Sequence, residues 1–238
     1  RAVEHGLEDV GTAGDLCAAS DINLSVCPPA AAEDVAQAVA ATAFKGLFDA
    51  CNAISPARLV RVRQIGEAGG ARAVDAGSIG PPAWKAGVTT IHLSGPDREL
   101  VAGCFEKGLL DALIMTDKVG EASALKMCYA AFTKGQAALL AAILAPADGL
   151  GVRDALNARW EADAAGTTAA REAIVQGVTG KAWRWVDELE EIGRTFGGSG
   201  QPDGFHFASA EIYRRLADLK DAPPPVAIED IVGKLKKN

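Results

Sequence analysis

Histidine is scarce in this 238-residue sequence, which contains only His5, His92 and His206. The three residues lie far apart in the chain, so a metal site would have to be assembled from distant positions. We therefore predict no metal site.

Cysteine is present but in no recognisable pattern. The five residues are odd in number, widely spaced, mostly inside apolar runs, and never form a Cys-x-x-Cys pair: Cys17, Cys27, Cys51, Cys104 and Cys128. These features argue against a disulfide framework and predict buried, reduced thiols in a cytoplasmic protein.

A long hydrophobic run and an excess of positive charge are also missing. The longest uninterrupted apolar run, 137–147, is too short to span a bilayer, and no signal peptide opens the chain. The net charge of -7 and the pI near 5.1 argue against a general surface for nucleic acid or membrane. A hydrophobic content of 49% is sufficient for a buried core, so we expect a soluble globular protein with one large domain or two.

The most informative segment is 120–144, which has the composition of one long helix. Glu121 suits the positive end of the helix dipole, and the helix is apolar except for one strip. Ser123, Lys126 and Tyr129 are three residues apart in that strip and share a face. Lys126 is accordingly the first candidate for chemistry.

The first half of the chain alternates short apolar runs with helical patterns. Strands are expected at 22–27, 47–51, 71–75, 89–94 and 112–116, with helices at 13–20, 31–41, 56–68 and 96–105 between them. This alternation predicts a parallel sheet covered by helices on both faces, with ligands beyond the carboxyl ends of the strands. A long loop rich in glycine and proline is expected at 77–87. After Pro146, where we expect the long helix to end, only helical patterns remain.

The order of these motifs resembles the family of β-hydroxyacid dehydrogenases and 6-phosphogluconate dehydrogenase. Four stretches carry the resemblance: Leu24-Ser25-Val26-Cys27-Pro28-Pro29, Asn52-Ala53-Ile54-Ser55-Pro56, Asp75-Ala76-Gly77-Ser78-Ile79-Gly80-Pro81, and Gly120 to Lys126. The resemblance implies an incomplete Rossmann-type NAD(P)-binding domain at 1–118. It also implies a helical substrate and dimerisation domain at 119–238, with the long helix joining the two.

The resemblance further implies the residues of the site. The cofactor, NAD or NADP, would contact Cys27, Pro28, Pro29 and Asn52, although an Asn at a strand end is often only a turn residue. The substrate would contact Ser78, Ile79 and Gly80, and Trp84 is expected to line the same pocket from the 77–87 loop. The protein would bind a small molecule and form a homodimer.

Lys126 would transfer a proton to or from the substrate oxygen, assisted by Tyr129. A lysine can do this because burial lowers its pKa toward neutral pH. The alternative is that Lys126 extends to solvent or pairs with Asp117 or Glu121.

Three departures from the family pattern bear on the substrate. The substrate loop has Ile79-Gly80-Pro81 where the family usually has Ser-Gly-Gly, and Ala130 stands where Asn usually follows the catalytic lysine. A Lys-Asp pair of the second domain is replaced by the acidic stretch 187–191. Fewer donors therefore remain for the carboxylate of a small 3-hydroxy acid.

The family's Gly-x-Gly-x-x-Gly fingerprint does not occur in the sequence, which begins at Arg1 rather than at a Met. We expect that a first βαβ unit of about 30 residues or more precedes it. The 238 residues alone are then expected to bind a dinucleotide weakly or not at all.

The sequence thus predicts an NAD(P)-dependent oxidoreductase acting on a small polar alcohol or the matching carbonyl. Two alternatives remain open: an imine-reductase-like enzyme acting on C=N bonds, and a non-catalytic member that binds a dinucleotide.

Overall fold

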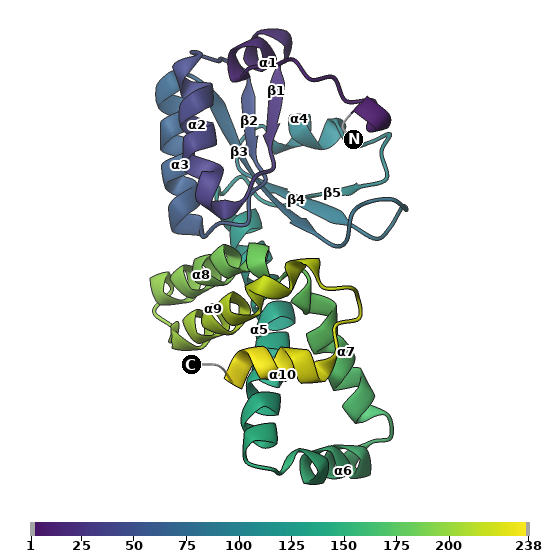
Figure 1. Ribbon diagram of the computed structural model, residues 1–238. Helices are drawn as coiled ribbons and strands as arrows, with labels where there is room; N and C mark the ends of the chain where they lie inside the picture. Colours follow the sequence, from purple (N-terminus) through teal and green to yellow (C-terminus); the bar gives the residue numbers. More distant parts are fainter. Residues whose placement is uncertain (1–2, 237–238) are drawn as a thin grey trace. The chain divides into compact units, whose positions relative to one another are not determined.

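The protein, described here from a computed structural model over residues 3–236, divides into two units. The first unit ends at Met127 and the second begins at Cys128. Figure 1 labels the elements of both. The domain boundary predicted from the sequence lies earlier, at 118/119. In the structure the first residues of the long helix group with the α/β unit. Each unit is described by itself.

The α/β unit contains a five-stranded sheet in the order β1-β2-β3-β4-β5. The strands are β1 (Ile22–Ser25), β2 (Leu47–Ala50), β3 (Arg72–Ile79), β4 (Thr90–Ser94) and β5 (Asp111–Ile114). Neighbouring strands are parallel except β3 and β4, which are antiparallel with Asp75 opposite Ser94 and Ile79 opposite Thr90.

The expectation of a sheet that is parallel throughout is wrong at this one pair. A parallel connection needs a crossover of a dozen or more residues, usually a helix. Only residues 80–89 separate β3 from β4, and they form no helix, so the chain turns back on itself. The pairing also extends β3 to Ile79, so the predicted loop begins three residues later than expected.

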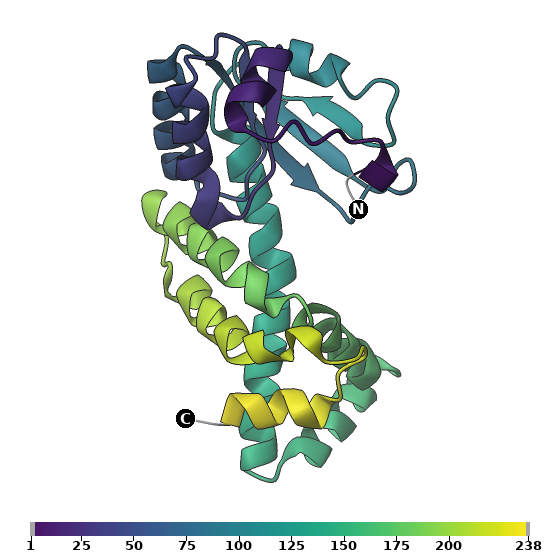
Figure 2. The ribbon, with the colours of Figure 1, turned by 45° about the horizontal axis from the view of Figure 1, so that its top comes forward.

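Helices cover both faces of this sheet. They are α1 (Ala13–Ala19), α2 (Ala32–Ala41), α3 (Pro56–Gly69) and α4 (Arg98–Gly103), with short 3-10 turns at Val3–His5 and Pro29–Ala31. One apolar core joins Phe48 to residues of α2 and α3, and a second joins Leu47 and Val74 to Val101 of α4. Figure 2 shows α2 and α3 lying side by side. Side chains of a strand point alternately to its two faces, so β2 contributes to both cores.

The ends of α3 follow from local sequence. Ser55 precedes the helix and its Oγ accepts from the Arg58 N–H at 3.4 Å, while Pro56 occupies the first turn, where its missing N–H is harmless. Gly70 ends the helix with φ of 104°, a left-handed conformation that favours glycine.

The long helix α5 runs from Glu121 to Gly149. Its 29 residues correspond to a length of about 43 Å at 1.5 Å per residue. Pro146 lies inside the helix rather than ending it, since the chain continues for most of another turn. By length and composition alone α5 could cross a membrane, but 56% of its most apolar window is buried inside the protein, as in a core helix.

The second unit is helical throughout residues 128–236. After α5 it contains α6 (Arg153–Asp163), α7 (Thr167–Thr179), α8 (Ala182–Gly198), α9 (Gly204–Leu216), a 3-10 segment η3 (Ala217–Asp221) and α10 (Ile228–Lys236). Its core includes Leu189 of α8 and Tyr213 of α9, and the Tyr213 hydroxyl donates to the Lys134 carbonyl at 3.2 Å.

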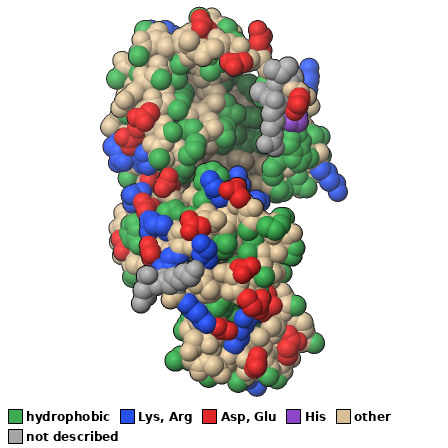
Figure 3. All heavy atoms as spheres, in the orientation of Figure 1, with side chains coloured by type: hydrophobic (Ala, Val, Ile, Leu, Met, Phe, Trp, Pro, Cys, Tyr) green, Lys and Arg blue, Asp and Glu red, His purple; other side chains and the backbone are tan. Residues whose placement is uncertain are grey.

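The acidic stretch 187–191 is used in ion pairs within this unit. Lys134 Nζ lies 2.9 Å from Glu188, which is buried, and Arg214 lies 2.9 Å from Glu190. Acidic and basic side chains are intermixed on this part of the surface (Figure 3). The reversed charge noted in the sequence therefore stabilises helix packing.

Candidate active site

Two of the predicted cofactor residues meet at the carboxyl ends of β1 and β2. The amide oxygen of Asn52 accepts from the Cys27 N–H at 3.0 Å and from the Cys27 thiol at 3.3 Å. The Asn52 Nδ2 donates to the Ser25 hydroxyl at 3.3 Å, and the side chain is only 2% exposed. Asn52 thus fixes the loop that contains Cys27, Pro28 and Pro29.

Lys126 is positioned by the end of β3. Its Nζ donates to the Ser78 carbonyl at 2.5 Å, and the side chain is half-buried. Glu121, one of the alternative partners considered from the sequence, accepts instead from the Thr116 hydroxyl at 2.6 Å. Ser78 thus meets Lys126 through its backbone rather than through its hydroxyl.

Gly77 allows α5 to approach β3 this closely. A Cβ atom at position 77 would lie 2.6 Å from the Ala122 carbonyl oxygen and 3.1 Å from Cβ of Lys126. The 2.6 Å contact is shorter than real Cβ atoms show, so any larger residue would require the strand or the start of α5 to move. The absent side chain at position 77 therefore sets the position of Lys126.

Asp75 anchors the N-terminus of α5. Its carboxylate accepts from the Gly120 and Ser123 N–H groups at 3.0 and 3.1 Å and from the Ser94 and Ser123 hydroxyls at 2.8 and 2.6 Å. Burial raises the pKa of Asp75, and these donated hydrogen bonds oppose the rise. This role was not predicted from the sequence, because Asp75 is 45 residues from Gly120 and 48 from Ser123 in the chain.

A second buried acid, Asp49, lies on β2 and was also missed. Burial, followed by repulsion from Asp75, raises its pKa to about 8, and neither carboxyl oxygen has a hydrogen-bond partner among residues 3–236. Burial, and secondly repulsion from Asp49, raises the pKa of the Cys51 thiol to about 12. The positive charge of Lys126 lowers this pKa, but by less. At neutral pH neither group supplies a negative charge to Lys126.

The remaining predicted substrate residues are at the end of β3 and in the loop that follows it. Trp84 is 71% exposed and its ring lies 5.2 Å from that of His5. Ile79 ends β3 half-buried, and Gly80 follows it exposed. The contact of Lys126 with Ser78 thus lies just before these residues along the chain.

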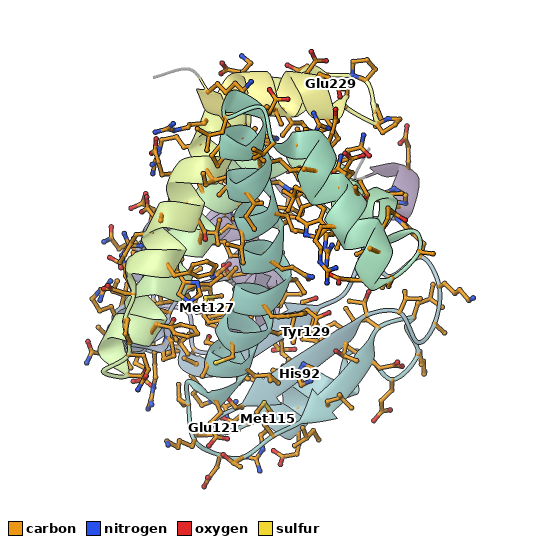
Figure 4. The ribbon with its side chains drawn as sticks, turned by 90° about the horizontal axis from the view of Figure 1, so that it is seen from below. His92, Met115, Glu121, Met127, Tyr129 and Glu229 are labelled. Carbon is orange, nitrogen blue, oxygen red and sulfur yellow. The ribbon has the colours of Figure 1, made fainter. Side chains whose placement is uncertain are left out.

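Tyr129 occupies the next turn of α5 after Lys126 and is 51% exposed. Figure 4 shows it on the side of α5 opposite to Met127, which is fully buried.

The same view shows His92 and Met115 on neighbouring segments of the sheet, and the Nδ1 of His92 is buried without a hydrogen-bond partner in the described chain. His92 is a further polar group that the sequence analysis did not assign to the site.

Comparisons with known proteins bear on the whole chain. Residues 147–216 match the family model described as a domain of unknown function (DUF1932). No curated protein sequence matches the chain. Solved structures do match the chain.

A conserved hypothetical protein from Sinorhizobium meliloti 1021 is 20% identical with a TM-score of 0.69, over 99% of this chain and 80% of the other. The 3-hydroxyisobutyrate dehydrogenase of Mycobacterium tuberculosis, in a structure with L-serine, is 16% identical with a TM-score of 0.68. The match covers 99% of this chain and 86% of that protein. The reductive aminase of Aspergillus terreus, in complex with NADPH4, cyclohexanone and allyl amine, is 18% identical with a TM-score of 0.52. The match covers 98% of this chain and 85% of that protein.

These likenesses confirm the resemblance drawn from the sequence at the level of the fold. The chain has the fold of the 3-hydroxyacid dehydrogenases, a mainly parallel sheet followed by a helical domain. Its second half contains the DUF1932 domain.

The strand-end residues fit one end of a nicotinamide dinucleotide. The loop that Asn52 fixes follows β1, and the amine of Lys126 lies at the carboxyl end of β3, so both are at the edge of the sheet where ligands of such folds bind. The pyrophosphate end is different, because no Gly-x-Gly-x-x-Gly loop occurs in these 238 residues.

Proposed function

We propose that the protein is an NAD(P)-dependent oxidoreductase that acts on a small polar alcohol or the matching carbonyl. The observation that carries the proposal is the position of the Lys126 amine at the carboxyl end of β3, 2.5 Å from the Ser78 carbonyl. The shared fold with 3-hydroxyacid dehydrogenases supports the reaction class. The nicotinamide, NAD or NADP, supplies the hydride when bound.

Lys126 supplies the proton in this proposal. The Ser78 carbonyl accepts an N–H of the amine and so directs it at the end of β3. Tyr129, one turn later, is proposed to donate to the same oxygen. Cys27, Pro28, Pro29 and Asn52 are proposed to contact the cofactor, with Ser78, Ile79, Gly80 and Trp84 on the substrate side.

Replacing Lys126 with Met tests the proposal in the protein expressed from its complete coding sequence. We expect turnover of an active carbonyl substrate to fall by about 10²- to 10⁴-fold, the usual contribution of general acid–base catalysis. Nicotinamide binding, followed by fluorescence, should change little. Lys118→Met, at an exposed position before α5, is the matched control and should keep its activity.

Near-normal turnover by Lys126→Met would remove the catalytic role. Cofactor binding without turnover of any alcohol, carbonyl or imine would favour the non-catalytic alternative.

A C=N reductase is the second candidate. Position 130, where the related dehydrogenases usually have Asn, is a buried alanine, so no amide is available there to hold a substrate carboxylate. Activity on a cyclic imine without activity on hydroxy acids would select this reaction.

We also propose that the protein is a cytoplasmic homodimer. The five cysteines are free thiols, which suits a reducing compartment. Exposed apolar side chains along α5, Tyr129, Phe132 and Leu139, support a contact with a second copy.

A further inference from the structure

A pocket within the helical unit is formed by residues that the proposed function does not use. Its volume is about 610 Å³, within the range of small-molecule sites. One wall is the C-terminal half of α7, from Ala173 to Gly180, and the other is the segment from Ala222 to Val226 that follows η3. The Gln176 Nε2 donates to the Val226 carbonyl at 2.9 Å and ties the two walls together.

The walls are small and apolar. Ala173 and Gly177 face the pocket from α7, and Pro224, Pro225 and Val226 face it from the opposite segment. Covering such a surface with an apolar group is favourable, and the free energy of binding becomes more negative in proportion to the apolar area removed from water. The surface offers few hydrogen-bonding groups to a polar body.

Two positive charges stand at this apolar surface. Lys181 and Lys220 both line the pocket, both are exposed, and neither forms an ion pair with any residue of the described chain. Lys181 has only an aromatic neighbour, with its Nζ 5.9 Å from the centre of the Trp185 ring. Among the described residues, no carboxylate side chain lines the pocket.

Two acids near these lysines are paired with other cations. Asp218, on the same 3-10 segment as Lys220, lies 3.1 Å from Lys234, and Glu172 of α7 lies 3.1 Å from Arg153. These two acids are therefore not available to balance the charge of Lys181 and Lys220.

We propose that this pocket binds a small organic carboxylate with a compact apolar body. The apolar part lies against Gly177 and Pro225, and the carboxylate lies between Lys181 and Lys220. This site is additional to the strand-end site and does not depend on its chemistry.

Calorimetric titration with octanoate at low salt tests the proposal. We expect saturable binding at one site per chain, with an affinity at least tenfold above that of acetate, which lacks the apolar body, and of octanol, which lacks the charge. Raising the salt should weaken the binding, because exposed lysines are screened. Failure of octanoate to bind, or equal binding of octanol, would overturn the proposal.

Gly177 provides the sharpest variant. A Cβ atom at this position would meet no atom within 4 Å, so Gly177→Leu places its side chain in the pocket without a clash and should abolish octanoate binding. Gly233→Leu is the matched control, since Gly233 is also helical and unobstructed but does not line the pocket.

The charge requirement is tested with Lys181→Met and Lys220→Met. Each should weaken octanoate binding by about threefold, and the double variant by about tenfold, as for solvent-exposed ion pairs. Lys107→Met, at an exposed position in the α/β unit, should bind as the unaltered chain does. Octanoate binding that is unchanged in both Gly177→Leu and the double lysine variant would place the ligand elsewhere and refute the site.

Discussion

At the scale of single residues, Asp49 is the group whose ionisation opposes folding. It is fully buried on β2, and its pKa of about 8 compares with an ordinary value of 3.8. Between these two values the unfolded chain has released the proton while the folded chain still holds it. The free energy of unfolding must therefore fall as the pH rises through this range, by about 1.4 kcal/mol for each pH unit at most.

Replacing Asp49 with Asn tests this linkage. We expect the variant to lose most of the decline in stability between about pH 5 and pH 8, and to be more stable than the unaltered chain at pH 8. Urea unfolding at a series of pH values measures the effect. Asp111→Asn, at an exposed position, should leave the pH profile as it was, and an unchanged profile in Asp49→Asn would show that this carboxyl is not the source.

At the scale of elements, the contact between β3 and the start of α5 sets both stability and activity. The replacement Gly77→Ala brings a methyl group within 2.6 Å of the Ala122 carbonyl, so either the strand or the helix must move. Overpacking of this kind costs about 1–3 kcal/mol, and the displacement carries Lys126 away from Ser78.

We expect Gly77→Ala to lower both the unfolding free energy and the turnover number. Chemical denaturation and steady-state kinetics on one preparation measure the two effects. Gly103→Ala is the matched control, because a Cβ at the end of α4 meets no atom within 4 Å. Equal behaviour of the two variants would contradict the account of Gly77.

Local sequence predicted the elements well where a residue acts on its own neighbours. Pro56 and Ser55 define the start of α3 in sequence and in structure alike. The direction of β4 was not predictable in this way, because its pairing with β3 depends on partners distant in the chain. Pro146 failed as a stop signal, since the helix tolerates one missing N–H near its end.

The candidate site was predictable only in part for the same reason. Lys126 stands out as one of only two lysines in a mainly apolar helix, and Asn52 and Cys27 follow recognisable strands. The role of Asp49 depends on its burial. The roles of Asp75 and Gly77 depend on the close approach of β3 to the start of α5, more than 40 residues later in the chain. Neither burial nor such an approach can be seen in a local sequence pattern.

At the scale of the whole molecule, the proposed dimer makes a direct prediction. Phe132 is 70% exposed on α5, next to Tyr129 on the same face. Phe132→Glu places a charge on this apolar strip and should shift the protein from dimer toward monomer, because an unpaired buried charge is costly. Light scattering after gel filtration measures the change, with Leu109→Glu, an exposed residue of the α/β unit, as the control. A Phe132→Glu variant that remains dimeric would exclude this strip as the contact.

The outer edge of the sheet has a consequence for the handling of the protein. β1 is four residues long and uncharged, and within residues 3–236 it pairs only with β2. Leu24 of this strand and Val26 just after it are exposed. Unprotected edges of this kind recruit strands from other molecules, and such growth is open-ended, whereas a dimer is closed. Concentrated solutions of these 238 residues are thus prone to aggregation through β1, and a charged residue such as Lys at position 24 would suppress it.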